Sequence, residues 1–293
     1  MAACVGLCSV SVGTVSYSAG YLRCYTKLDF LGGLVMNKIA ISGKGGVGKT
    51  TLCALVVHAL AESGQKVYAI DADPNPTLAE ALGFPPEVVS EITPIIEMEK
   101  LIEERTGSRA GEYGSYFKLN PRVKDIPDEY SVQKDNISYL MMGMMRGAGK
   151  GCACAQNSML KALVTHLLVK EKETVVLDMV AGTEHMGRGT AESVDAMIIV
   201  VEPALRSIKA AKEFSRMAAD LGIKNIYVAG NKVTGPEDEE YIRSKMPGFS
   251  VAGFLPYTAQ VIQAERDGSV LYEQSVEMKN AVHGILQNIS ILA

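Results

Sequence analysis

Short apolar runs rich in β-branched residues alternate with longer stretches of helical periodicity along most of the chain. The pattern predicts strands at 38–42, 66–71, 137–142, 174–178, 196–201, 225–230 and 250–255. It predicts helices near 49–62, 157–169, 205–220, 258–267 and 275–290. Alternation of this kind is typical of a parallel sheet that is covered on both faces. The predicted fold class is therefore α/β, a mostly parallel central sheet with helices on both faces.

Two segments depart from this pattern. Residues 1–36 have no periodicity and end at Met36, which stands before the first strand as an initiator methionine would. Their first basic residue is Arg23, whereas a secretory signal needs a basic region before its apolar stretch. We therefore expect an extension outside the fold, from a mis-set start or as a flexible tail, and one domain at 37–293. The insertion at about 84–136 is either a helical cover or a lid or docking surface, and both interpretations stay open.

A glycine-rich loop follows the first predicted strand. It reads Gly43, Lys44, Gly45, Gly46, Val47, Gly48, Lys49, Thr50, Thr51 and fits G-x-x-x-x-G-K-[ST] between a strand and a helix. In such a P-loop, backbone N–H groups and the helix N-terminus bind phosphate oxygens. Lys49 is expected to reach the β- and γ-phosphates of ATP, and the Thr50 hydroxyl to bind Mg²⁺.

Carboxylates end two other predicted strands. Asp71 and Asp73 close the second strand, and Asp178 closes the run 174–178. Ligands of open α/β sheets bind at this carboxyl edge, so we expect Asp178 to hold Mg²⁺ directly or through water. Asp71 is expected to support the loop or the metal. Turn or helix-cap chemistry remains the alternative for all three residues.

Two further strand ends are candidates for the adenine site. Asn231 and Lys232 follow the strand at 225–230, and Pro256 follows the strand at 250–255. An asparagine amide suits a purine edge, although asparagine is also a common turn residue.

The form Gly-Lys-Gly-Gly-Val-Gly-Lys-Thr resembles the deviant Walker A loop of the family that contains the nitrogenase iron protein, the septum-site and partition ATPases and several metal-insertion factors. The resemblance implies that Lys44 crosses a homodimer interface to the nucleotide of the partner and takes part in catalysis. It also implies that Asp73 orients or deprotonates the attacking water. A solvated loop lysine is the alternative for Lys44.

Cys152 and Cys154 form an isolated C-x-C in a glycine-rich loop. Two nearby thiols can bind one soft ion, but a tetrahedral site needs four ligands. If the chain is a homodimer, the partner supplies the other two, so we expect Ni²⁺ or Zn²⁺ on the two-fold axis. A redox pair and two inert thiols are the alternatives.

Composition narrows the class of partner. The chain has 293 residues, 29 Lys and Arg against 33 Asp and Glu, and a formal charge of −4. The sequence has no Lys/Arg-rich block of the kind that binds nucleic acid. The composition requires no membrane span. Six cysteines are too few for a disulfide scaffold in a chain of this length. The expected location is the cytoplasm.

The P-loop, the C-x-C and the segments 117–121 and 184–190 together resemble the nickel-insertion ATPases that mature carbon monoxide dehydrogenase, and the related acetyl-CoA synthase maturation factors. The resemblance covers about 37–290 and implies an ATPase that binds nickel at the paired cysteines and serves one of these client enzymes. Val180 departs from it, since an acidic residue is expected there. The alternative is an iron–sulfur electron carrier similar to the nitrogenase iron protein, although that protein draws its cysteine ligands singly from separate loops.

Overall fold

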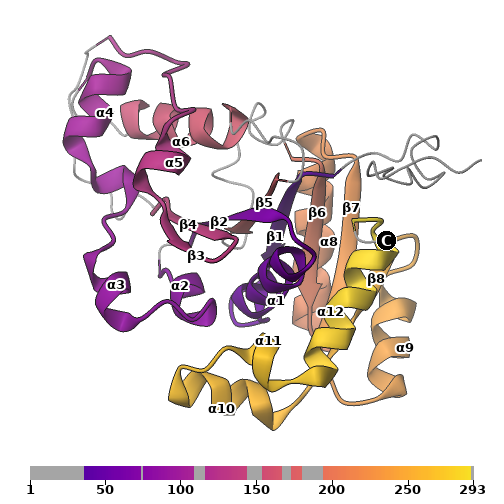
Figure 1. The fold of residues 1–293 in the computed structure, drawn as a ribbon. Helices are drawn as coiled ribbons and strands as arrows, with labels where there is room; N and C mark the ends of the chain where they lie inside the picture. The colour runs from indigo at the N-terminus through magenta and orange to yellow at the C-terminus, as the bar shows by residue number, and fades with distance from the viewer. Residues whose placement is uncertain are drawn as a thin grey trace, which may run out of the picture. The chain divides into compact units, whose positions relative to one another are not determined.

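The computed structural model describes residues 36–73, 75–108, 116–143, 154–166, 173–179 and 194–291. Within them the chain forms an eight-stranded sheet in the order β3-β4-β2-β5-β1-β6-β7-β8 (Figure 1). The strands are β1 Lys38–Gly43, β2 Lys66–Ala72, β3 Val132–Lys134, β4 Ile137–Met141, β5 Glu173–Met179, β6 Ala196–Val201, β7 Asn225–Val233 and β8 Ser250–Pro256. Neighbouring strands are parallel except β3, which is antiparallel to β4. The α/β prediction is confirmed.

Helices cover both faces of this sheet in the described part of the chain. They are α1 Lys49–Glu62, α2 Leu78–Ala81, α3 Pro86–Glu91, the 3-10 turn η1 Ile95–Glu97, α4 Glu99–Thr106, α5 Ile126–Tyr130, α6 Cys154–His166, α8 Leu205–Asp220, α9 Pro236–Lys245, α10 Ala259–Asp267, α11 Leu271–Gln274 and α12 Val276–Asn288. Alternate residues of β1 divide the core: Ile39 and Ile41 pack with α1 and α12, and Ala40 packs with α6 and α8. Each central strand is therefore apolar on both sides.

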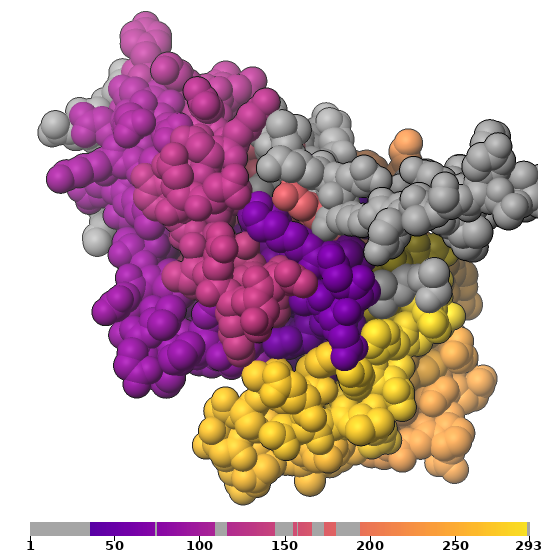
Figure 2. Space-filling view, in the orientation of Figure 1, coloured from indigo at the N-terminus to yellow at the C-terminus, as the bar shows by residue number. Residues whose placement is uncertain are grey.

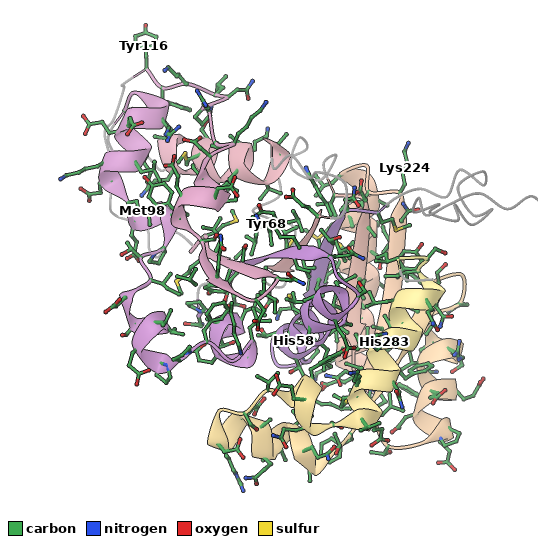
Figure 3. All side chains as sticks on the ribbon, in the orientation of Figure 1. His58, Tyr68, Met98, Tyr116, Lys224 and His283 are labelled. Carbon is green, nitrogen blue, oxygen red and sulfur yellow. The ribbon has the colours of Figure 1, made fainter. Side chains whose placement is uncertain are left out.

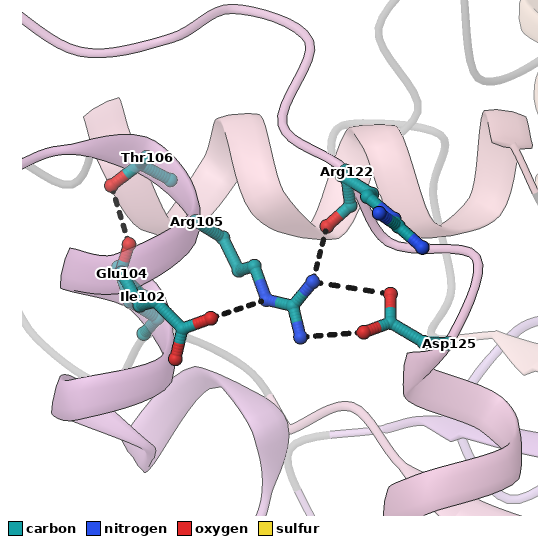
Figure 4. A network of polar contacts seen from close by, with 6 residues as sticks. All are labelled: Ile102, Glu104, Arg105, Thr106, Arg122 and Asp125. Carbon is teal, nitrogen blue, oxygen red and sulfur yellow. Dashed lines mark hydrogen bonds and ion pairs between the residues drawn. The ribbon is translucent and has the colours of Figure 1, made fainter.

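The insertion contains α3, η1, α4, α5 and β3. Leu101 and Ile126 are buried in the core layer that contains α6. Arg105 of α4 donates to both carboxylate oxygens of Asp125, at 3.1 and 2.6 Å, and so joins α4 to the start of α5 (Figure 4). At the far end Tyr116 is 99% exposed (Figure 3). Leu119 is 72% exposed. The helices therefore pack on the core, and both interpretations of the insertion, a helical cover and a lid or docking surface, stay predictions.

Several predicted features fall outside the described residues, among them Cys152. They also include the extension up to residue 35 and the segment around Val180, with residues 184–190. None of the described helices is long and apolar enough to cross a membrane.

Candidate functional site

The P-loop lies in the middle of the sheet, at the carboxyl end of β1. β1 pairs with β5 on one side and with β6 on the other. The chain leaves β1 toward β2, on the β5 side, and leaves β5 toward β6, on the opposite side. Such a reversal opens a crevice at the carboxyl edge, where α/β proteins bind their ligands.

Two glycines give the loop its shape. Gly48 has φ +92°, and a Cβ there would lie 2.1 Å from the Asn231 side-chain nitrogen. Gly43 lies against β6, where a Cβ would be 2.6 Å from the Val200 carbonyl oxygen. A larger residue at either position displaces the loop, which explains the glycines of the motif.

Two residues near the carboxyl end of β7, and one residue directly after β6, hold this loop in place. The Asn231 amide donates to the Val47 carbonyl at 2.8 Å, and its oxygen accepts from the Lys232 backbone N–H at 2.8 Å. The Lys232 ammonium donates to the Gly46 carbonyl at 2.7 Å and to Glu202 at 3.3 Å. These contacts hold the carbonyl oxygens of Val47 and Gly46. They therefore fix the orientation of the peptide groups whose N–H groups are expected to bind phosphate. We call Asn231, Lys232 and Glu202 the loop clamp.

The residues predicted to contact adenine already have other contacts in the structure. Asn231 is 6% exposed and already holds the P-loop. Pro256 is half-buried beside Val233, and Tyr257 next to it is 58% exposed. A base contact from Asn231, Lys232 or Pro256 stays a prediction.

Lys49 and Thr50 begin α1 and face the acidic side of the site. Lys49 is 7% exposed, and its charge lowers the pKa of Asp178. The Thr50 hydroxyl donates to the Asp178 carboxylate at 2.6 Å. The structure thus brings together three residues that the sequence assigns to the phosphates and Mg²⁺.

The Asp178 carboxylate suits a divalent cation. Its Oδ1 is buried and has no hydrogen-bond partner among the described residues. Burial and the neighbouring Asp71 carboxylate raise the pKa of Asp178 to about 7, although Thr50 and Lys49 act the other way. A buried carboxylate oxygen without a partner is costly, and a cation beside it removes that cost. The residues present therefore fit Mg²⁺.

Asp71 supports the loop that carries Asp73. Asp71 is fully buried, and burial raises its pKa to about 6. One of its oxygens accepts from the Asp73 N–H at 3.0 Å, and the other accepts from the Leu78 N–H at 3.2 Å and the Tyr139 hydroxyl at 3.2 Å. Asp73 itself accepts from the Asn75 N–H at 2.9 Å. Asp71 is a loop-supporting residue, and Asp73 stands in a turn at the mouth of the site.

The structure gives fewer contacts for Lys44 and for the cysteine pair. Lys44 is half-buried, and no described side chain forms an ion pair or hydrogen bond with its ammonium group. Cys152 lies outside the described residues, and Cys154 is the first residue of α6. No group of three or more potential metal ligands occurs among the described residues. The metal assignment stays a prediction.

Sequence reasoning did not find Glu202 or Tyr139 as parts of the site. Glu202 directly follows an apolar strand, which is the same signal that identified Asp178. Tyr139 lies inside a strand and carries no local signal, because its partner Asp71 is 68 residues away.

Fold and loop together define a P-loop nucleotide-binding protein. Residues 38–271 match the CobQ/CobB/MinD/ParA nucleotide binding domain. The chain is 41% identical over 249 residues to the carbon monoxide dehydrogenase accessory protein CooC of Rhodospirillum rubrum, covering 85% of this chain and 94% of that protein. It is 45% identical over 231 residues to an uncharacterized ATP-binding protein of Methanocaldococcus jannaschii, covering 78% and 88%.

Solved structures show the same fold. The MinC:MinD cell division protein complex of Aquifex aeolicus matches with a TM-score of 0.62 and 20% identity, over 87% of this chain and 96% of that chain. A ParA family ATPase of Chlorobium tepidum also matches with a TM-score of 0.62, at 15% identity, over 87% and 100%. The chain belongs to the CobQ/CobB/MinD/ParA family of P-loop ATPases and, within it, to the CooC type. The predictions of family and of an ATPase are confirmed.

Proposed function

We propose that this protein is an ATP-dependent accessory protein that delivers nickel to carbon monoxide dehydrogenase or to acetyl-CoA synthase. The observation that carries the proposal is the 41% identity to CooC along 94% of that protein, on a chain whose P-loop contains Lys44. Nickel is the cargo in this proposal, and ATP supplies the free energy.

The P-loop residues divide the work of hydrolysis. The loop N–H groups and Lys49 bind the β- and γ-phosphates, while the loop clamp holds the carbonyls behind them. Thr50 and Asp178 hold Mg²⁺, which neutralises charge on the phosphates. Asp73 orients the water whose oxygen bonds to the γ-phosphorus as the bond to the β-phosphate oxygen breaks. ADP leaves with the electrons of that bond, and the proton of the water passes to the phosphate product.

A homodimer links this chemistry to the metal. Lys44 is half-buried without a described partner inside its own chain, as expected of a cation that meets the nucleotide of a second subunit. Cys154 begins α6, and the N-terminus of a helix stabilises a thiolate. Cys152 and Cys154 of two subunits offer four thiolates to one Ni²⁺, and Zn²⁺ suits the same ligands. ATP binding closes the dimer around the ion, and hydrolysis opens it.

Nickel titration of the metal-free full chain tests the proposal. With ATP and Mg²⁺ we expect one Ni²⁺ per two chains, at the mass of a dimer. Cys152→Ala/Cys154→Ala loses the ion, whereas Cys53→Ala, which changes a buried core cysteine, keeps it. A brown protein that absorbs near 400 nm as isolated indicates the iron–sulfur alternative. Unchanged nickel binding by the double variant contradicts the metal site.

A further inference from the structure

A cavity runs along α1, next to the nucleotide site. Its volume is about 430 Å³, within the range of small-molecule sites. One stripe of α1 lines it, from Thr50 and Thr51 at the P-loop end to His58, and α2, α10 and α11 form the other walls. The stripe follows helical spacing, since Ala54 and Leu55 lie between these ends. Asn231 and Pro256, the predicted base contacts, are not among its lining residues.

The walls of the cavity are apolar and its mouth is acidic. Leu55, Ala264 and Tyr272 are at most 7% exposed and form the inner surface. Glu80 of α2 and Glu265 of α10 also line the cavity, and both are exposed to solvent. No Lys or Arg occurs among the described lining residues, so these carboxylates have no cationic neighbour within the cavity. An apolar body with a positive charge matches this distribution.

His58 contributes no opposing charge. Its ring stacks on Tyr272 with centroids 5.5 Å apart. Burial lowers its pKa to about 4, and Lys134 acts in the same direction. The imidazole is therefore neutral near pH 7.

Two lysines approach the walls without lining the cavity: Lys279 lies 4.9 Å from the Tyr272 ring centroid and pairs with Glu62, and Lys134 donates to the Leu82 and Gly83 carbonyls. Glu80 and Glu265 are thus the charged side chains among the described lining residues.

Two walls of the cavity are connected to catalytic elements. The α1 wall begins at Thr50, whose hydroxyl binds Asp178. The α2 wall follows the loop of Asp73, and the Leu78 N–H binds Asp71. Both α2 and α11 contact α1 and lie beside it in Figure 1, and in Figure 2 the yellow C-terminal surface borders the indigo surface of α1. A molecule between α1 and α2 therefore touches the helix that carries Thr50 and the helix that follows the Asp73 loop.

We propose that the cavity between α1, α2, α10 and α11 binds a small apolar molecule with one cationic group, and that its occupancy changes the rate of ATP hydrolysis. This effector site does not depend on the nickel proposal, because it uses neither Lys44 nor the cysteine pair.

Three probes with one aromatic body test the charge preference. They are 2-naphthylmethylamine, 2-naphthylmethanol and 2-naphthoate, and their binding to the full chain is measured by titration calorimetry. We expect the amine to bind most tightly and the carboxylate least. Glu80→Gln and Glu265→Gln are each expected to weaken the affinity for the amine about threefold, as for the loss of a solvent-exposed ion pair. Neither change is expected to alter the affinity for the alcohol. Equal affinities of the three probes overturn the proposal.

Filling the cavity tests the location. Ala81→Phe and Val261→Phe place rings on opposite walls, and each is expected to weaken the amine at least tenfold. Ala219→Phe, on the exposed side of α8, is the matched control and binds as the wild type does. Retained ADP binding shows that a variant is folded. Wild-type affinity for the amine in both filled variants overturns the location.

Two measurements test the coupling to the nucleotide site. The amine at saturation is expected to change kcat for ATP at least twofold in the wild type and not in Ala81→Phe. Saturating ADP leaves the amine bound. If ADP displaces it one for one, the cavity is part of the nucleotide site and the proposal of a separate effector site fails. An unchanged kcat with the amine bound overturns the regulatory part.

Discussion

The Asn231 side chain makes one hydrogen bond to the P-loop and one within β7. Its amide donates to the Val47 carbonyl, and its oxygen accepts from the Lys232 N–H. Neither bond requires a bound base. We infer that Asn231 acts on the nucleotide through the shape of the loop, since the loop binds phosphate with the peptide N–H groups that these contacts orient.

We expect Asn231→Ala to lower the affinity for ADP about tenfold, because a buried backbone carbonyl loses its partner and the loop loses its support. Affinity for tripolyphosphate, which has no base, is expected to fall by a similar factor. Calorimetry of both ligands checks this. Asn225→Ala is the control on the same strand, since Asn225 donates to the Asp195 backbone away from the site. An ADP defect without a tripolyphosphate defect shows that Asn231 contacts the base instead.

His58 makes the stability of the fold depend on pH. Its pKa is about 4 in the folded chain against an ordinary value near 6.5. Between these values the unfolded chain binds a proton that the folded chain does not, so the free energy of unfolding decreases as the pH falls. The neighbouring charges, Lys134 and Asp135, act in opposite directions.

Urea unfolding of wild type and His58→Phe at pH 7.5 and pH 5 measures this effect. We expect the wild type to lose at most about 2 kcal/mol more than the variant between these pH values. The ring of Phe keeps the stacking on Tyr272 but does not titrate. Taking the difference from the variant removes the contribution of Asp71, whose raised pKa acts the other way. Equal pH dependence of the two proteins contradicts the prediction.

At the level of elements, prediction from sequence succeeded where the signal is local. The bounds of α1 and α8 agree with the predicted helices, because each follows a clear apolar strand and has its own periodicity. The sequence did not reveal α9, although Gly235, Pro236 and three acidic residues in its first turn are a helix start signal. It also missed β3, whose three residues pair antiparallel with β4 and are too few to form a pattern.

In the site too, residues with a local sequence signal were predicted and residues without one were not. The P-loop, Thr50 and Asp178 follow from strand ends that can be recognised one by one. The loop clamp does not, since Asn231 lies 184 residues from Val47 and the contact depends on how β1, β6 and β7 are ordered in the sheet. A strand-end asparagine predicts a polar group at the right edge, and only the three-dimensional arrangement identifies its partner.

Within the described part of the insertion, a largely buried ion pair between Arg105 and Asp125 joins α4 to the start of α5. Arg105 and Asp125 are 14% and 24% exposed, and the pairing is bidentate. The Arg105 guanidinium lowers the pKa of Asp125, so this stabilisation is present at neutral pH and is lost as the pH falls through the folded pKa.

A double-mutant cycle with Arg105→Met and Asp125→Asn tests this pair. We expect a coupling of about 1 to 3 kcal/mol in the free energy of unfolding, because the bonds are charge-assisted and partly buried. The exposed pair Lys66 and Asp128 is the control and is expected to couple by less than about 1 kcal/mol. A coupling near zero for Arg105 and Asp125 shows that packing alone holds α4 and α5 together.

At the scale of the whole molecule, the proposed homodimer gives different roles to the two lysines of the P-loop. Lys49 is 7% exposed and its charge acts on Asp178, whereas Lys44 is half-buried and acts on no described carboxylate. In the proposed homodimer, Lys49 binds the nucleotide of its own subunit and Lys44 binds the nucleotide of the other.

We expect Lys44→Ala to remain a monomer with ATP and Mg²⁺ under conditions in which the wild type dimerises. Loss of a charge-assisted contact across an interface is expected to raise the dimer dissociation constant at least about tenfold. ATP affinity of the monomer changes little, because Lys49 and the loop clamp remain. Sedimentation velocity with a non-hydrolysable ATP analogue measures the first quantity, and calorimetry measures the second. Lys224→Ala removes an exposed lysine in the turn before β7 and is the matched control (Figure 3). If Lys44→Ala dimerises like the wild type but binds ATP weakly, Lys44 acts on its own nucleotide and the proposed contact across the dimer is wrong.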